Sequence, residues 1–248
     1  SVVETIKRLV NGISDATKAV GVTWVHSSTG VKLPLRALSD AINKINAKRG
    51  SDRQIIFCVD GVHGFGIENI DISTLGCDFF IAGTHKWIFG PRGTGIIWGS
   101  DKGWEHCKPI IPGFGRSGAV WRGTASLDEV PAGEHMTPGG FHSFEHRWAL
   151  PEAFKLHLQL GKAQIQKRIH ELNTQTKHAL AEIPKVKLYT PIAAELSSGF
   201  VCFDIEGMAQ SDVVKSMYGQ GVVMSNTQYK ESYARFAPSL FNDENQLA

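Results

Sequence analysis

Two side chains suited to covalent chemistry follow neighbouring apolar runs of the sequence. Lys86 lies in the segment GTHKW, and Asp60 directly follows the apolar run Ile55–Val59. A lysine amine can hold an aldehyde as a Schiff base. A carboxylate can keep the nitrogen of a pyridine ring protonated, so that the ring draws electrons from a substrate carbon. The pair therefore predicts a site for pyridoxal phosphate.

The residues next to this pair strengthen the prediction. Thr84 and His85 directly precede Lys86 and carry a hydroxyl and an imidazole that can both donate to a phosphate group. His63 lies three residues after Asp60 and can bond to the phenolic oxygen of the cofactor or pack on its ring. A lone lysine or histidine is more often a solvated or hydrogen-bonded surface residue, so the prediction depends on the grouping.

The first half of the chain alternates helix and strand. The apolar spacing predicts helices over residues 1–18 and 33–48, and strands at 21–25, 55–59, 77–82 and 95–98. Apolar runs without alternation, separated by helices, are typical of a buried, mostly parallel sheet that helices cover on both faces. In such sheets ligands bind at the carboxyl ends of the strands, which is where Asp60 lies.

The second half is organised differently. Residues 99–143 are rich in glycine and proline, and loops of this length are often functional. A helical pattern runs from residue 144 to about residue 183, with a break expected at Gly161. After Pro184, short apolar runs surround a helical pattern at 209–219, which predicts a small α+β domain.

We expect residues 1–160 to form part of a large cofactor-binding domain, and residues 161–248 to form a connecting helix and a small C-terminal domain.

One arginine of this second half could complete the site. Arg235 lies in a predicted strand of the small domain. Its planar guanidinium could form a bidentate pair with a substrate carboxylate. Without a site to face, Arg235 would be an ordinary surface residue.

Composition and motifs disfavour several other functions. The net charge of +2 gives no reason to expect nucleic acid as a partner, and no apolar run approaches the ~18–20 residues of a membrane span. The motif HSFEH at 142–146 is not the zinc motif HExxH, so we expect no metal site. Residues 90–95 lack the GxxxxGK[ST] pattern of nucleotide-binding loops. The four cysteines form no CxxC pair and are expected to be buried thiols.

Four segments, taken in order, resemble the class V aminotransferase family of fold-type I pyridoxal phosphate enzymes. They are VTWVHSSTG (22–30), VDGVHGFG (59–66), GTHKWIFGPRGTG (83–95) and YARFAPSLFN (233–242). The resemblance covers nearly the whole chain. It implies an α/β fold with a mostly parallel sheet flanked by helices, a small C-terminal α+β domain, pyridoxal 5'-phosphate as cofactor, and a homodimer.

The resemblance also implies roles for the residues that suggested the site. Lys86 matches the lysine that forms the internal aldimine with the cofactor. Asp60 matches the partner of the pyridinium nitrogen, and His63 matches a contact to the ring or to its oxygen. Thr84 and His85 match donors to the phosphate.

Two further cofactor contacts are implied with less certain alignment. Thr29, or Ser27 beside it, matches a cofactor contact in the loop after the first strand. Thr137, in the stretch TPGG, matches the phosphate contact that the second subunit of the dimer gives. His142 and Ser143 compete with Thr137 for this role.

The small-domain part of the resemblance bears on the reaction. Arg235 matches the arginine that binds the substrate α-carboxylate. Cysteine desulfurases of the family place a nucleophilic cysteine shortly before this arginine, whereas residues 224–232 contain none. Persulfide chemistry needs a thiolate, so desulfuration is disfavoured. The chain is more similar to the isopenicillin-N-epimerase-like branch.

The resulting expectation is an enzyme that acts at Cα of an amino acid or of a peptide-borne amino group, with Lys86 as the base. Epimerases, aminotransferases and lyases share the Cα carbanion, so the reaction type stays open. Family members usually carry a segment ahead of position 1, so we expect part of the large domain to be missing. A catalytically incomplete fragment that serves as a binding or assembly module is the alternative. The location is open between the cytoplasm and, with an export signal ahead of Ser1, the periplasm.

Overall fold

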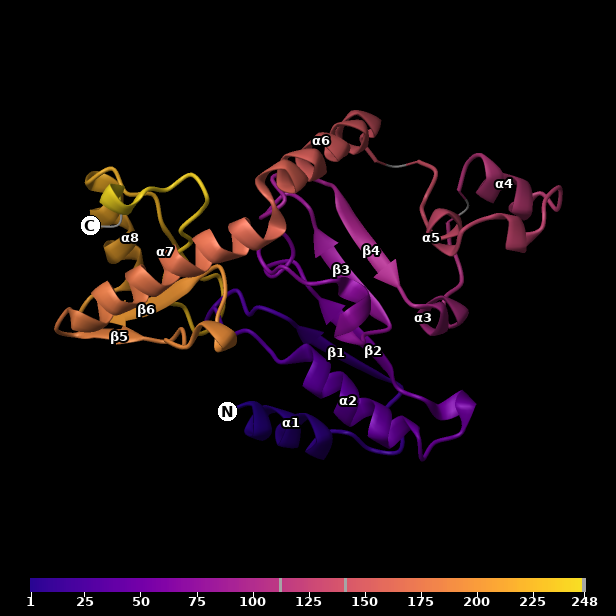
Figure 1. The fold of residues 1–248 in the computed structure, drawn as a ribbon, viewed down its shortest axis with the longest axis horizontal. Coiled ribbons are helices and arrows are strands. Elements are labelled where there is room, and N and C mark those ends of the chain that lie inside the picture. Colours follow the sequence, from indigo (N-terminus) through magenta and orange to yellow (C-terminus); the bar gives the residue numbers. More distant parts are fainter. Residues whose placement is uncertain (112, 141, 247–248) are drawn as a thin grey trace.

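Two sheets joined by a long helix make up the fold (Figure 1). The structure is a computed structural model, and it describes residues 1–111, 113–140 and 142–246. The predicted class is confirmed, because a mostly parallel sheet with flanking helices is followed by a small α+β part. The expected boundary between residues 160 and 161 stays a prediction.

The larger sheet positions the residues with chemical potential. Its strands, in spatial order, are β1 (Ala19–Thr23), β2 (Ile56–Asp60), β3 (Phe79–Gly83) and β4 (Gly95–Gly99). β1, β2 and β3 pair in parallel, whereas β4 is antiparallel to β3. The carboxyl ends of β2 and β3 therefore meet at the same edge of the sheet.

The first two helices pack beside this sheet, next to each other (Figure 1). They are α1 (Val2–Asn11) and α2 (Leu35–Asn46). The prediction of a helix up to residue 18 was wrong at its end, because the backbone N–H of Gly12 donates to the carbonyls of Arg8 and Leu9 and closes the last turn. α2 begins after Pro34, which suits a helix start because proline lacks an N–H that could be bonded.

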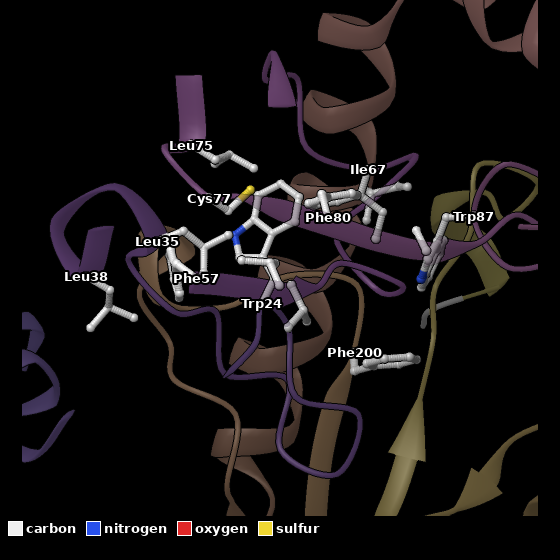
Figure 2. Packing of buried hydrophobic residues seen from close by; sticks show 14 of the residues in the cluster. Trp24, Leu35, Leu38, Phe57, Ile67, Leu75, Cys77, Phe80, Trp87 and Phe200 are labelled. Carbon is white, nitrogen blue, oxygen red and sulfur yellow. The ribbon is translucent and has the colours of Figure 1, made fainter. Parts of the chain in front are cut away.

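The hydrophobic core extends from the sheet to the site. Figure 2 shows Trp24 near the middle of the buried cluster, and its ring meets the ring of Phe80 edge to face at 5.9 Å between centroids. Trp87 and Phe200 lie at one side of the same cluster, with their centroids 5.8 Å apart. Because Trp87 is buried directly after Lys86, the core anchors the backbone of the lysine segment.

The glycine- and proline-rich segment forms short helices instead of one long loop. They are α3 (Asp101–Glu105), α4 (Arg116–Trp121) and α5 (Ala132–His135). Figure 1 shows α4 extending away from both sheets, whereas α5 lies next to β4 of the larger sheet. Five 3-10 turns complete the described structure, at Ser51–Arg53, Ile72–Leu75, Leu127–Glu129, Ala194–Leu196 and Glu244–Gln246.

Two helices lead from this segment to the smaller sheet. α6 (Phe144–Leu160) and α7 (Lys162–Glu182) are separated at Gly161, whose φ of +83° suits glycine, so the predicted break is confirmed. Ile165 of α7 packs in the core of the larger sheet, whereas Leu180 packs in that of the smaller one. α7 therefore belongs to both cores. Within the described ranges, no helix has the length and apolar character needed to cross a membrane.

The smaller sheet is antiparallel throughout. Its strands run in the order β5 (Val186–Leu188), β6 (Val201–Ile205), β8 (Ala234–Phe236) and β7 (Ser225–Asn226), with α8 (Gln210–Gly219) packed against them. Neighbouring strands pair over only two or three residues, so the sheet is small. Arg235 lies in β8, which is the last strand of the sheet in chain order.

A buried carboxylate ties the two parts together. Glu68 accepts hydrogen bonds from Lys32 Nζ at 2.8 Å, from His170 Nε2 at 2.8 Å and from Ser198 Oγ at 2.6 Å. Its side chain is only 8% exposed. Burial opposes its charge, but the bond from His170 and the ion pair with Lys32 prevail and hold the pKa of Glu68 at about 2. Glu68 thus connects the segment after β2 with α7 and with the chain that leads into β6.

Candidate functional site

The structure brings Asp60 and Lys86 to the same edge of the larger sheet. Asp60 is the last residue of β2, and Lys86 follows the last residue of β3, Gly83, by three positions. In the register of this parallel pair, Asp60 lies opposite Ile81. Both side chains are exposed, so they are free to meet a ligand at the carboxyl edge.

Glycines shape the turn after Asp60. The carboxylate Oδ1 of Asp60 accepts from the N–H of Val62 at 3.1 Å, which is an Asx turn. A Cβ at Gly61 would overlap the ring of Phe80. Gly66 has a φ of +93°, and a Cβ there would lie 2.7 Å from the carbonyl carbon of Trp87. The turn therefore approaches the core and the lysine segment more closely than a side chain would permit.

His63 is buried in this turn with an unsatisfied ring nitrogen. Its Nδ1 has no hydrogen-bond partner among the described residues, and its ring meets Phe200 edge to face at 4.7 Å. Burial, and then the positive charges of Lys86 and Arg235, lower the pKa of His63 to about 4. The imidazole is therefore neutral at pH 7 and keeps a buried nitrogen for a ligand. Such an orphaned polar atom is uncommon in folded proteins and indicates a missing partner.

Thr84 is buried and braces the loop that carries Lys86. Its N–H donates to the carbonyl of Thr94 at 3.1 Å, and its own carbonyl accepts from Gly90 at 2.9 Å. The Thr94 hydroxyl donates to Pro91, so the hydrogen bond between the two threonine hydroxyls uses the Thr84 proton. The role of Thr84 as a phosphate donor stays a prediction.

The backbone after Lys86 contains a strained residue. Phe89 has a φ of +60°, a region that bulky residues rarely adopt, and its N–H donates to the carbonyl of Lys86 at 3.2 Å. The ring of Phe89 packs against His157 and Phe241. These contacts hold the tight turn that leaves Lys86 and His85 exposed at the sheet edge.

Arg235 faces the same site from the smaller sheet. Its Nη1 donates to the carbonyl of Ser27 at 2.8 Å, and its Nε and Nη2 donate to the hydroxyl of Ser225 at 3.2 and 3.1 Å. The guanidinium stacks on the ring of Phe200 at 4.7 Å. A guanidinium has five N–H donors, so two are left in addition to these three bonds. Arg235 is thus held at the site instead of lying on a free surface. The role of Arg235 in binding a substrate carboxylate stays a prediction.

The loop after β1 contributes Ser27 more directly than Thr29. The hydroxyl of Ser27 lies 2.6 Å from the hydroxyl of Tyr229, and its carbonyl is the acceptor for Arg235. The hydroxyl of Thr29 contacts His26 Nδ1 at 3.4 Å and accepts from Val31 within its own turn. A cofactor contact by Thr29 stays a prediction, and Ser27 is the better placed of the two toward Arg235.

Thr137 lies two residues after the end of α5. Its hydroxyl donates to the carbonyl of Gly133 at 2.6 Å, which closes the end of α5. It lines a cavity of about 500 Å³ together with Thr94, His142 and Ser143. The three candidates for the phosphate contact therefore share one cavity, next to the loop that Thr84 braces, and the choice among them stays a prediction.

Two residues of the site were missed by sequence reasoning. Phe200 touches Trp87, His63 and Arg235, and Tyr229 contacts Ser27. Neither residue lies in a motif that indicates a function. An aromatic residue in a short strand or loop is most often an ordinary core or surface residue, so nothing in the sequence singled these two out. Among the described residues, no group of three or more His, Cys, Asp or Glu is placed to hold a metal ion.

Comparisons with known proteins identify the family of the chain. The family model described as aminotransferase class-V matches residues 3–227. Isopenicillin N epimerase from Streptomyces clavuligerus is 26% identical over 198 residues, which are 78% of this chain and 48% of the relative. A probable cysteine desulfurase from Halalkalibacterium halodurans is 26% identical over 212 residues, covering 86% of this chain and 48% of the relative.

A solved structure of C-DES, a mutant with glycine covalently linked to the PLP cofactor, has the same fold. It superposes with a TM-score of 0.81 at 20% identity, over 98% of this chain and 61% of that chain. The chain spans about half the length of the curated relatives that it matches. The match to C-DES shows the fold alone, since the identity is low.

Proposed function

Because the chain belongs to the class V aminotransferase family, we propose that it carries the catalytic lysine of a pyridoxal phosphate-dependent enzyme that acts at Cα of an amino acid or of a peptide-borne amino group. The observation that carries this proposal is the placement of Lys86, Asp60 and His63 after two strands that end at one sheet edge, with Lys86 and Arg235 close enough for their charges to act on His63. The donor set and the unpartnered nitrogen of His63 fit the cofactor.

Each of these residues has a physical task in the proposal. When bound, pyridoxal phosphate supplies an electron-withdrawing ring that stabilises negative charge at Cα. Lys86 would hold the cofactor through its amine, and the same amine would move the Cα proton. Asp60 keeps the pyridine nitrogen protonated, and neutral His63 hydrogen-bonds to the cofactor. Arg235 binds the substrate carboxylate.

Desulfuration is the least supported of the family's reactions. Residues 224–232, which lead to Arg235, contain no cysteine. Cys202 lies opposite Arg235 in the sheet, but it is fully buried, and burial raises the pKa of its thiol to about 12. A thiol in this state is not a nucleophile at neutral pH. Epimerisation, transamination and elimination are the reactions that the site supports.

A second copy of the chain is the proposed partner. Ile110 and Phe114, between α3 and α4, and Trp148 of α6 expose large apolar side chains, at 92%, 72% and 72% exposure. Exposed apolar groups of this size mark interaction surfaces. The homodimer would bring Thr137, His142 or Ser143 of one copy to the phosphate of the other. Light scattering of Phe114→Ser against the unchanged protein tests the dimer, which the variant should weaken.

Cofactor trapping tests the function itself. The protein is mixed with pyridoxal phosphate, reduced with borohydride and mapped by mass spectrometry. We expect the cofactor on Lys86 and its loss in Lys86→Ala, whereas Lys44→Ala, which removes an exposed lysine of α2, should trap normally. A protein that cannot be loaded at all would instead support a binding or assembly module.

A further inference from the structure

The loop between β7 and β8 presents Tyr229 in a fixed position. Thr227 is buried, its N–H donates to the carbonyl of Tyr233 at 2.9 Å, and its hydroxyl accepts from the N–H of Tyr233 at 2.9 Å. The hydroxyl of Ser232 donates to the carbonyl of Thr227 at 2.6 Å. The loop is therefore closed on itself by three bonds, and Tyr229 lies within it.

Tyr229 reaches across to the larger sheet. Its hydroxyl lies 2.6 Å from Ser27 Oγ, a contact between residues 202 positions apart, and its ring lies 6.0 Å from that of His26. Ser27 also receives Arg235 Nη1 through its carbonyl. Two side chains of the smaller sheet thus converge on one serine of the loop after β1.

The chain connects these two contacts directly. The closed loop ends at Tyr233, and Arg235 follows two positions later on β8. A shift of the loop against the Ser27 segment would therefore move the guanidinium, whose two remaining N–H groups are the proposed carboxylate donors.

We propose that Tyr229 is a positioning residue for substrate binding: its bond to Ser27 holds the loop in place and so sets where Arg235 meets the substrate carboxylate. The proposal rests on the proposed function. Its effect falls on substrate affinity, because neither Tyr229 nor Ser27 reaches the reacting Cα in this role. A surface hydrogen bond without this role would leave affinity unchanged.

Three variants and a matched control test this role in the cofactor-loaded protein. Tyr229→Phe removes only the hydroxyl, Ser27→Ala removes its partner, and the double variant removes both. We expect each to raise KM about 10-fold, with kcat changed less than about twofold, and the double variant to be no worse than either single one. Tyr218→Phe, on the exposed face of α8, should behave as the unchanged protein.

A second measurement follows the loop without any substrate. Hydrogen exchange of the amides of residues 227–233 should be at least about 5-fold faster in Tyr229→Phe and Ser27→Ala than in Tyr218→Phe. Equal exchange, or an unchanged KM in Tyr229→Phe while Lys86 still traps the cofactor, would overturn the positioning role alone. Failure to trap Lys86 in the unchanged protein would refute the proposed function, and this role with it.

Discussion

The two sides of the site differ in how far apart their residues lie in the chain. On the cofactor side, Asp60 and Lys86 are 26 positions apart and follow two neighbouring parallel strands. On the substrate side, Ser27 meets Arg235 across 208 positions. The strand order alone places the first pair, whereas the second depends on how the smaller sheet docks. The cofactor side should therefore tolerate changes that disturb the substrate side.

Phe200 is the physical link between the two sides. Its ring touches His63 on the cofactor side and the guanidinium of Arg235 on the substrate side. It also packs on Trp87, which follows Lys86. The position of this one aromatic ring therefore affects residues on both sides of the site.

The largest expected effect belongs to the cofactor side. Lys86→Ala should lower kcat by about 10²–10⁴-fold, because the proton at Cα loses its positioned base. Steady-state kinetics with the proposed amino acid substrates measures this change, with Lys44→Ala as control. A variant that keeps more than about a tenth of the turnover would show that another group moves the proton.

Loss of the buried carboxylate should disturb both sides together. Glu68→Gln leaves Lys32, whose side chain is 14% exposed, without its partner, and should lower the free energy of unfolding by about 3–5 kcal/mol. Urea unfolding measures this loss. Glu4→Gln removes one partner of the exposed pair with Arg8 and should cost less than about 1 kcal/mol. Equal losses in the two variants would contradict the assigned role.

The pH dependence of stability distinguishes His63 from Glu68. The folded pKa of His63 is about 4, below the 6.5 of an unfolded histidine, so the unfolded state takes up the proton first. The contribution of His63 to the free energy of unfolding is therefore fully present above pH 6.5, and it falls by about 1.4 kcal/mol per pH unit down to about pH 4. For Glu68, with its pKa at about 2, stability falls only below about pH 4.5.

Urea unfolding of the unloaded protein at pH 7 and pH 5 tests this difference. His63→Gln should reduce the loss between these two pH values, since glutamine does not titrate, and His157, whose pKa burial also lowers, should account for part of the loss that remains. The same loss in His63→Gln and in the unchanged protein would place the titration on another group.

The smallest of these effects is expected on the substrate side. Arg235→Lys keeps the charge but loses the planar fork, and should raise KM about 10- to 100-fold while cofactor trapping on Lys86 continues. Arg36→Lys, on the exposed face of α2, serves as control. Trapping lost together with affinity would show that the two sides are not separable.

The same difference explains what the sequence could predict. Apolar runs that end in Asp60 and Gly83 locate two strand ends, and parallel pairing brings such ends together without further information. The position of Arg235 follows only from its match to the family. The contacts of Phe200 and Tyr229 depend on tertiary docking that no local pattern records.

Local hydrogen bonding accounts for the remaining differences. The phosphate role of Thr84 stays a prediction, but its hydrogen bond to the hydroxyl of Thr94, ten positions later, could not be predicted from the residue types. The helix predicted up to residue 18 ends at Asn11, because Gly12 closes the last turn. Which hydrogen-bond partner a side chain or a backbone N–H finds depends on the fold, so residue types alone do not predict it.

Reductive trapping of the cofactor tests the central claim most directly. The unchanged protein is incubated with pyridoxal phosphate, reduced with borohydride, digested and mapped by mass spectrometry. The proposal predicts one modified peptide that contains residues 83–95 with the cofactor mass on Lys86, and its absence in Lys86→Ala. The same extent of labelling in Lys86→Ala, or labelling centred on another lysine, would contradict it.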